Sequence, residues 1–131
     1  MYASRRDMRG RKMLNIHLLS LKCDQTTSDA LAGFEDITLL LDTHTCGTWW
    51  LSAGDRINFD FFSPGFIPGS DSTSWGISLE HAGTFSGEIE TAILDLASFD
   101  WFDSFWSKIR EVKFLRYGGD YTVSYKFDDL S

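Results

Sequence analysis

Residues 118–127 read Gly-Gly-Asp-Tyr-Thr-Val-Ser-Tyr-Lys-Phe, and this stretch decides the predicted architecture. From residue 121 onward, large apolar side chains alternate with the polar side chains of Thr122, Ser124 and Lys126. Such a period of two places alternate residues on opposite faces of a strand. The preceding Gly-Gly-Asp is a turn signal. The stretch therefore predicts a turn followed by a strand with one buried face.

The same alternation recurs upstream, in short segments separated by turns rich in Gly, Pro, Asp and Ser. The further strands are expected at residues 14–23, 36–41, 48–51, 57–62, 75–80, 88–94 and 112–117. In the first of them the alternation changes phase by one residue after Leu18, which is what a β-bulge produces. Regularly spaced short strands are typical of an all-β sandwich. We therefore expect one antiparallel β-sandwich of about eight strands.

One segment departs from this pattern. In residues 98–110 the apolar side chains of Phe99, Phe102, Trp106 and Ile109 recur at spacings of three and four. That spacing places them on one face of a helix. The sequence thus predicts one short helix near residues 98–110.

Charge divides the chain into two parts. The 131 residues carry a formal net charge of −7, yet residues 1–12 hold five basic residues against one acidic residue. We interpret residues 1–12 as a basic flexible leader and residues 13–131 as the sandwich domain. An acidic body argues against nucleic acid, whose phosphates need Lys and Arg. We expect no transmembrane segment and no recognisable signal peptide, so the protein is either cytoplasmic or exported by another route.

The search for catalytic motifs favours a protein that is not an enzyme. The chain has none of the phosphate-binding, nucleophile-elbow or His-Glu-x-x-His motifs, and its three histidines stand apart in the sequence. The two cysteines, Cys23 and Cys46, are too few for a disulfide framework. Two free thiols are the favoured interpretation, although a single bridge between them stays open.

Acidic residues near one connection suggest a cation. The first connection between strands is bracketed by Asp24, Asp29, Glu35 and Asp36. Calcium takes oxygen ligands, usually from several carboxylates at one end of a scaffold. These four residues are the calcium candidates. Asp42, His44 and Cys46 could also converge on a transition metal such as zinc, but structural zinc sites take four ligands and an ordinary polar turn is favoured, so calcium is the one cofactor predicted as possible.

Aromatic residues suggest a contact surface. Trp49 and Trp50 are neighbours, so on a strand they must face opposite sides, and one of them is exposed or covered by something else. Trp101 and Phe105 lie off the apolar stripe of the predicted helix. Because exposed aromatic side chains mark contact sites, we predict partner binding through Trp50, Trp101 and Phe105.

The order of these elements resembles the small C2-like or PLAT-like β-sandwich modules. The segments that carry the resemblance are Leu21-Lys22-Cys23 followed by Thr26, residues 36–41, Trp49-Trp50 followed by Gly54-Asp55, residues 75–80, and residues 119–125. Together they span about residues 13–128. The resemblance implies a non-enzymatic module that binds membranes, proteins or calcium.

The chain departs from that pattern at one loop. Where such modules often carry acidic residues after the strand ending at Glu80, residues 81–87 read His-Ala-Gly-Thr-Phe-Ser-Gly and contain no carboxylate. A calcium cage built from two loops would lose half of its ligands. The resemblance therefore implies the scaffold more than the ion.

These observations lead to three functional hypotheses. The first is a non-catalytic binding or assembly module that presents loops and an aromatic patch to a protein partner. The second is a calcium-dependent module that binds a membrane or a glycan. The third is a structural component of a larger particle or fibre, with self-assembly through the basic leader.

Overall fold

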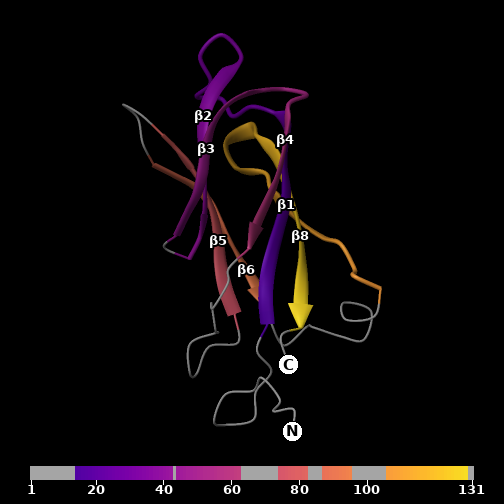
Figure 1. Ribbon diagram of the computed structural model, residues 1–131. Coiled ribbons are helices and arrows are strands. Elements are labelled where there is room, and N and C mark those ends of the chain that lie inside the picture. The colour runs from indigo at the N-terminus through magenta and orange to yellow at the C-terminus, as the bar shows by residue number, and fades with distance from the viewer. Residues whose placement is uncertain (1–13, 43, 63–73, 83–86, 96–105, 130–131) are drawn as a thin grey trace, which may run out of the picture.

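Within the described part of the chain, eight strands form two antiparallel sheets that face each other (Figure 1). The computed structural model describes residues 14–42, 44–62, 74–82, 87–95 and 106–129. The strands are β1 (Leu14–Gln25), β2 (Phe34–Leu41), β3 (His44–Ser52), β4 (Arg56–Phe62), β5 (Ser74–His81), β6 (Gly87–Asp95), β7 (Arg110–Phe114) and β8 (Asp120–Asp129). A 3-10 turn, η2 (Arg116–Gly118), joins the last two strands. The all-β sandwich predicted from the sequence is confirmed.

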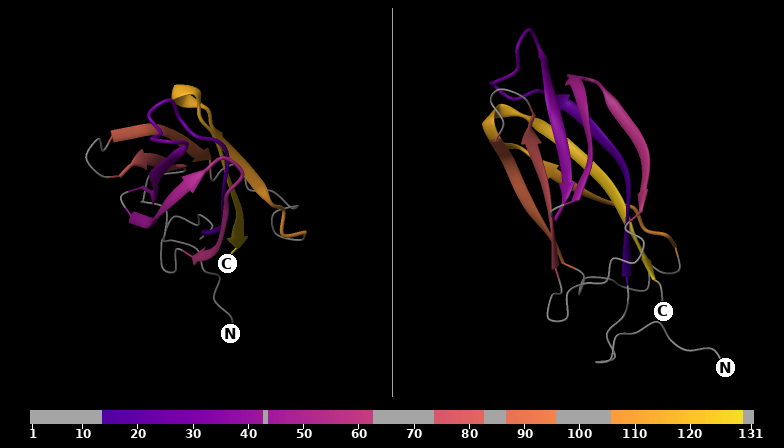
Figure 2. Two further views of the ribbon diagram at one scale, coloured as in Figure 1. Left: turned by 90° about the horizontal axis from the view of Figure 1, so that it is seen from above. Right: turned by 60° about the vertical axis from the view of Figure 1, so that its left-hand side comes forward.

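Each sheet combines strands from the first and the second half of the chain. One sheet has the order β4-β1-β8-β7 and the other has the order β3-β2-β5-β6. The first and last strands of the chain are thus neighbours in the interior of one sheet, and Figure 2 shows the two layers from two further directions. The strand predicted from residues 121–127, β8, is therefore a central strand of its sheet.

The predicted bulge lies in β1. The register of β1 against both of its neighbours shifts between Leu18 and Ser20. Before the shift Ile16 and Leu18 are fully buried, and after it Leu21 and Cys23 are. The bulge thus keeps one face of this long strand turned toward the core, because it compensates for the change of phase in the sequence.

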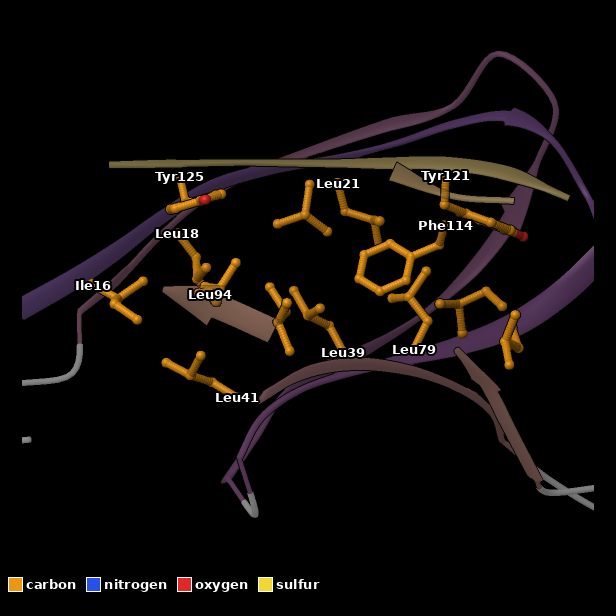
Figure 3. Packing of buried hydrophobic residues seen from close by; sticks show 14 of the residues in the cluster. Ile16, Leu18, Leu21, Leu39, Leu41, Leu79, Leu94, Phe114, Tyr121 and Tyr125 are labelled. Atoms are coloured by element: carbon orange, nitrogen blue, oxygen red, sulfur yellow. The ribbon is translucent and has the colours of Figure 1, made fainter. Parts of the chain in front are cut away.

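Side chains from both sheets fill the space between them (Figure 3). From β8, the core receives Tyr121, Val123, Tyr125 and Phe127, as the alternation of residues 121–127 predicts. The facing sheet contributes the fully buried side chains Ile37, Leu39, Leu41, Ile77 and Leu79. This apolar layer is the main source of stability, at roughly 25 cal/mol for each Å² removed from water.

Two predicted boundaries need correction. Residues 42–47 were expected to form a turn, but β3 begins at His44 and pairs with β2 from there. The turn is shorter because β3 pairs with β2 as far as Leu41 and His44, and Asp42 between them has a positive φ of 53°. Asp42 is also bonded to β5: its Oδ1 accepts from the Gly76 amide at 2.8 Å, and its own amide donates to the Gly76 carbonyl at 2.7 Å. The strand expected at residues 112–117 is β7, which starts earlier and ends at Phe114, because Tyr117 adopts a positive φ of 53°.

Most of the predicted helix lies outside the described residues, as do the basic leader at 1–12, Trp101 and Phe105. In the described part, from Trp106 to Arg110, the backbone is not helical. Ser107 has a positive φ of 49°, which a right-handed helix excludes, and Arg110 already pairs with β8. Helical spacing of apolar residues is therefore misleading there. Among the described residues, no helix has the length and apolar character needed to cross a membrane.

Neighbouring leucines on β2 test the inward face. Leu39 is fully buried, whereas Leu40 lies on the outer face and is only partly covered. We expect Leu39→Ala to lower the free energy of unfolding by about 2–5 kcal/mol, and Leu40→Ala to lower it by clearly less. Urea denaturation of both variants measures the difference. Equal losses would contradict the assignment of the two faces.

Candidate functional site

One end of the sandwich gathers the connections of greatest interest. There β1, β3, β5 and β7 end, and β2, β4, β6 and β8 begin. We call this the apical end; it lies at the top of Figure 1, opposite the start of β1 and the end of β8. The loop between β1 and β2 projects furthest there. Two features stand out at this end, a buried polar cluster and an exposed apolar tip.

The polar cluster surrounds the carboxylate of Glu35, whose side chain is almost wholly buried. Oε2 accepts from the Thr27 amide at 2.9 Å and from the Tyr121 hydroxyl at 2.5 Å. Oε1 accepts from the Thr27 hydroxyl at 2.5 Å and lies 2.9 Å from Nε2 of His81. Each oxygen therefore has two partners, and they come from three separate parts of the chain. We call these four residues the Glu35 cluster.

The alternation of the strands brings these side chains together. Glu35 continues the inward face of Ile37 and Leu39 by two residues, and His81 likewise continues the inward face of β5. His81 is the register partner of Ile37, so Glu35 lies two residues beyond that partner on the same face, and the two polar side chains meet diagonally across the strands. Tyr121 reaches them from the opposite sheet because β8 begins at this end. The core is thus polar where its apical end closes.

The cluster sets the protonation of its members. Burial favours the neutral form of Glu35, but the hydrogen bonds from Thr27, Tyr121 and His81 outweigh it and lower the pKa of the carboxyl below 4.5. Burial, and then the bond to the Glu35 carboxylate, raises the pKa of Tyr121 far above its ordinary value. Burial also raises the pKa of the nearby Cys23 thiol. At neutral pH the cluster holds one buried negative charge surrounded by donors.

This geometry does not prepare a nucleophile. In a Ser-His-Asp triad the two imidazole nitrogens face different partners, the hydroxyl and the carboxylate. Here the same atom, Nε2 of His81, lies 3.0 Å from the Thr27 hydroxyl and 2.9 Å from Glu35 Oε1. The Thr27 hydroxyl is buried and is bonded to the carboxylate itself. The contacts of the cluster instead join the loop between β1 and β2 to strands β2, β5 and β8.

Thr27 is the point at which the cluster holds the loop between β1 and β2. The next residue donates its amide to the Tyr117 carbonyl at 2.8 Å, which joins this loop to the turn between β7 and β8. Gly119 lies so close that a Cβ atom there would meet the Thr27 methyl group at 2.9 Å. A side chain at position 119 would push the two loops apart, so glycine is required by this close approach.

A two-residue turn closes the end of the same loop, before β2. Leu31 and Phe34 exchange backbone hydrogen bonds of 2.9 and 3.0 Å across Ala32 and Gly33. Both intervening residues have positive φ, 53° and 81°, as a type I′ turn requires. Leu31 at the turn is 74% exposed. An aliphatic side chain is thus exposed to water beside a hydrogen-bonded turn.

Trp50 extends this tip onto the neighbouring strand. It is 58% exposed, and its ring stacks on Phe34 with centroids 5.6 Å apart and planes within 3°. Trp49 faces the opposite side and stacks on Phe59 at the margin of the core. The two neighbouring tryptophans therefore have different environments, as their positions on one strand predict. We call Leu31, Phe34 and Trp50 the apolar tip.

The four calcium candidates do not share one environment. Asp24 is exposed and pairs with Lys22 at 3.1 Å, while Asp29 is exposed in the loop. Glu35 points into the polar cluster, and Asp36, the next residue on β2, faces the other way. Within the part of the chain that the structure describes, no three His, Cys, Asp or Glu side chains are grouped closely enough to hold a metal ion. Both cysteines are free thiols.

The phase of two polar residues in the sequence is a signal for the polar cluster that catalytic motifs do not capture. Glu35 and His81 stand in phase with the buried residues of their strands, which is unusual for polar side chains unless they are paired. That phase would have indicated two inward polar residues at one end of one sheet. Their bonds to Thr27 and Tyr121 depend on how the two sheets face each other, which alternation does not encode.

Comparisons with known proteins concern the fold. No protein-family model and no curated protein matches the chain. Among solved structures, it is similar to a C2 domain of plant Extended Synaptotagmin 1, with a TM-score of 0.45 and 10% identity over 92% of this chain and 96% of that one. It is also similar to human GIVD cytosolic phospholipase A2, with a TM-score of 0.48 and 13% identity over 92% of this chain but only 18% of that one. Both TM-scores lie below 0.5 and both identities below 25%, so neither likeness assigns a family or a function to this chain.

Acid titration tests the buried carboxylate. Because the pKa of Glu35 is lowered in the folded protein, the stability it contributes is present above about pH 4.5 and is lost as the pH falls through the lower folded value. Glu35→Gln should lower the free energy of unfolding at neutral pH by roughly 1–3 kcal/mol and flatten its dependence on pH. Urea denaturation between about pH 3 and pH 7 measures both effects.

The exposed variant Asp29→Asn is the matched control, since it removes a carboxylate from the same loop. It should leave both quantities close to those of the wild type. A Glu35→Gln protein with unchanged stability and an unchanged pH profile would show that the cluster does not stabilise the fold.

Proposed function

We propose that the chain is a non-catalytic docking module that inserts its apolar tip into a lipid interface. The observation that carries this proposal is the tip itself, an exposed leucine on a hydrogen-bonded turn and an exposed tryptophan on the neighbouring strand β3, at the projecting end of the sandwich. An exposed apolar cluster of this kind is typical of a contact surface. The same proposal leaves the rest of the fold as the scaffold that presents the tip.

The backbone of the tip suits a lipid environment. A polar backbone group that enters hydrocarbon without a partner costs several kcal/mol. Leu31 and Phe34 satisfy each other's amide and carbonyl groups across the turn, so this part of the tip can leave water without losing hydrogen bonds. A second loop at the same end adds the exposed side chains of Leu115 and Tyr117. Tyr and Trp are enriched where one end of a side chain is apolar and the other is wet.

Charge narrows the type of lipid. The chain carries a formal net charge of −7, which disfavours a strongly anionic surface. Insertion would therefore rely on burial of apolar surface, and a zwitterionic bilayer is the appropriate target.

The second candidate is an apolar groove on a protein partner. A protein partner is also the first hypothesis drawn from the sequence. The Phe34–Trp50 stack favours it, because tryptophan is common among the residues that dominate protein interfaces. We place the lipid interface ahead of it because the loop that carries the tip projects and because Leu31 and Phe34 satisfy each other's backbone groups.

Vesicle sedimentation tests the proposal. Wild-type protein should pellet with zwitterionic phosphatidylcholine vesicles, and Leu31→Ser and Trp50→Ala should each weaken partitioning by roughly tenfold. Ile93→Ser is the matched control, since Ile93 is 66% exposed on β6 but pairs with Gly76, far from the apical end. The control should bind as the wild type does.

Two outcomes count against the lipid interface. A wild-type protein that stays in the supernatant would leave the protein groove as the better candidate. An Ile93→Ser variant that loses as much binding as Leu31→Ser would mean that general hydrophobicity, rather than the tip, drives the association.

A further inference from the structure

We propose that the donors around Glu35 replace a divalent cation as the organiser of the apical end, so that the module docks without calcium. This inference rests on the proposed docking function for its second half. Its first half, that calcium has no role in assembling the loops, stands on the contacts alone. These contacts are the hydrogen bonds and ion pairs that carboxylates at the apical end make with other residues of the protein.

Glu35 has no acceptor capacity to spare. An ionised carboxylate offers about four lone-pair directions, two on each oxygen. The Thr27 amide, the Thr27 hydroxyl, the Tyr121 hydroxyl and Nε2 of His81 occupy them at 2.5–2.9 Å. A cation that entered would have to displace at least one of these donors and leave it unpaired in a buried site, which is costly. Glu35 is therefore unsuited to bind calcium in this arrangement.

Several other carboxylates at the apical end also have partners within the protein. Asp24 pairs with Lys22 at 3.1 Å, and Asp120 pairs with Lys113 at 3.3 Å. Asp55 accepts from the amide and hydroxyl of Ser52 at 2.9 and 3.2 Å, which fixes the turn between β3 and β4. The Asp55 contacts shape a turn, whereas the two exposed ion pairs engage Asp24 and Asp120 on their strands.

The other three predicted calcium ligands, Asp24, Asp29 and Asp36, are not grouped: within the described residues no three His, Cys, Asp or Glu side chains lie close enough to hold a metal ion. Calcium takes about six to eight oxygen ligands. The facing connection, residues 82–87, adds no carboxylate because its sequence contains none. The residues thus do not fit a calcium site, and the disagreement with the calcium-dependent hypothesis has a physical cause.

The donor set performs the task that a cation would perform. A divalent ion at the end of a sandwich draws acidic loops together through a shared charge. Here the shared charge is the Glu35 carboxylate, and donors from the β1–β2 loop, β5 and β8 converge on it. The tip lies on the strand and loop that flank this carboxylate, since Phe34 precedes Glu35 directly. The apical end is therefore assembled as soon as the chain folds.

Thermal unfolding with the metal alone tests the first half of the proposal. A ligand that binds only the native state must raise Tm. We expect Tm to be the same, within experimental error, in about 10 mM calcium chloride and in excess chelator. A rise of several degrees that the double variant Asp29→Asn, Asp36→Asn abolishes would overturn the proposal.

Sedimentation with phosphatidylcholine vesicles in calcium and in chelator tests the second half. We expect equal binding in the two conditions, and Tyr121→Phe should bind more weakly in both because it removes one donor from Glu35. Tyr125→Phe, which removes a hydroxyl from an inward residue further along β8, is the control and should bind as the wild type does. Binding that appears only with calcium, or a Tyr121→Phe defect that calcium repairs, would overturn the inference.

The two proposals fail in different ways. If the wild type binds no vesicles in either condition, the docking function is wrong, and the comparison of Tm values still decides whether calcium organises the loops. If the vesicles bind and Tm rises with calcium, the docking function holds and the inference is wrong.

Discussion

The rest of the apical end depends on one buried negative charge. A carboxylate that leaves water costs several kcal/mol unless it is fully hydrogen-bonded, so Glu35 constrains every group that surrounds it. Its four contacts fix the position of Thr27 in the first loop, the end of β5 at His81 and the start of β8 at Tyr121. The two sheets therefore meet at a defined point at this end. An apolar residue at position 35 would bury surface equally well but would leave those donors without a common partner.

The same charge anchors a loop that exposes apolar residues. The loop between β1 and β2 is held at its base by Thr27, beside η2 by the bond from Ser28 to Tyr117, and at its tip by the reciprocal bonds of Leu31 and Phe34. Ordering a loop costs conformational entropy, and a tip that is already ordered avoids that cost when it binds. The polar contacts below and the apolar surface above are thus joined through one loop, between β1 and β2.

The sequence predicts the parts of this structure that depend on local pattern. The alternation of residues 121–127 gives the central strand, and the change of phase after Leu18 gives the bulge of β1, because both follow from which side chains must avoid water. The pattern fails at residues 42–47, where pairing with β2 extends β3 back to His44. It also fails from Trp106 to Arg110, where Ser107 has a positive φ and Arg110 already pairs with β8. Trp50 could be identified as one of two alternatives, whereas the partners of Glu35 could not be predicted because they come from the facing sheet.

The central claim is that Glu35 holds the first apical loop through its donors. Amide hydrogen exchange at Thr27 and Ser28, compared between the wild type and Tyr121→Phe, tests it most directly, because the first amide donates to Glu35 and the second joins the two loops. The account predicts exchange at least about tenfold faster at both amides in the variant, while the buried middle of β1 around Leu18 keeps its protection. Unchanged protection of Thr27 and Ser28 in a folded Tyr121→Phe protein would contradict the claim.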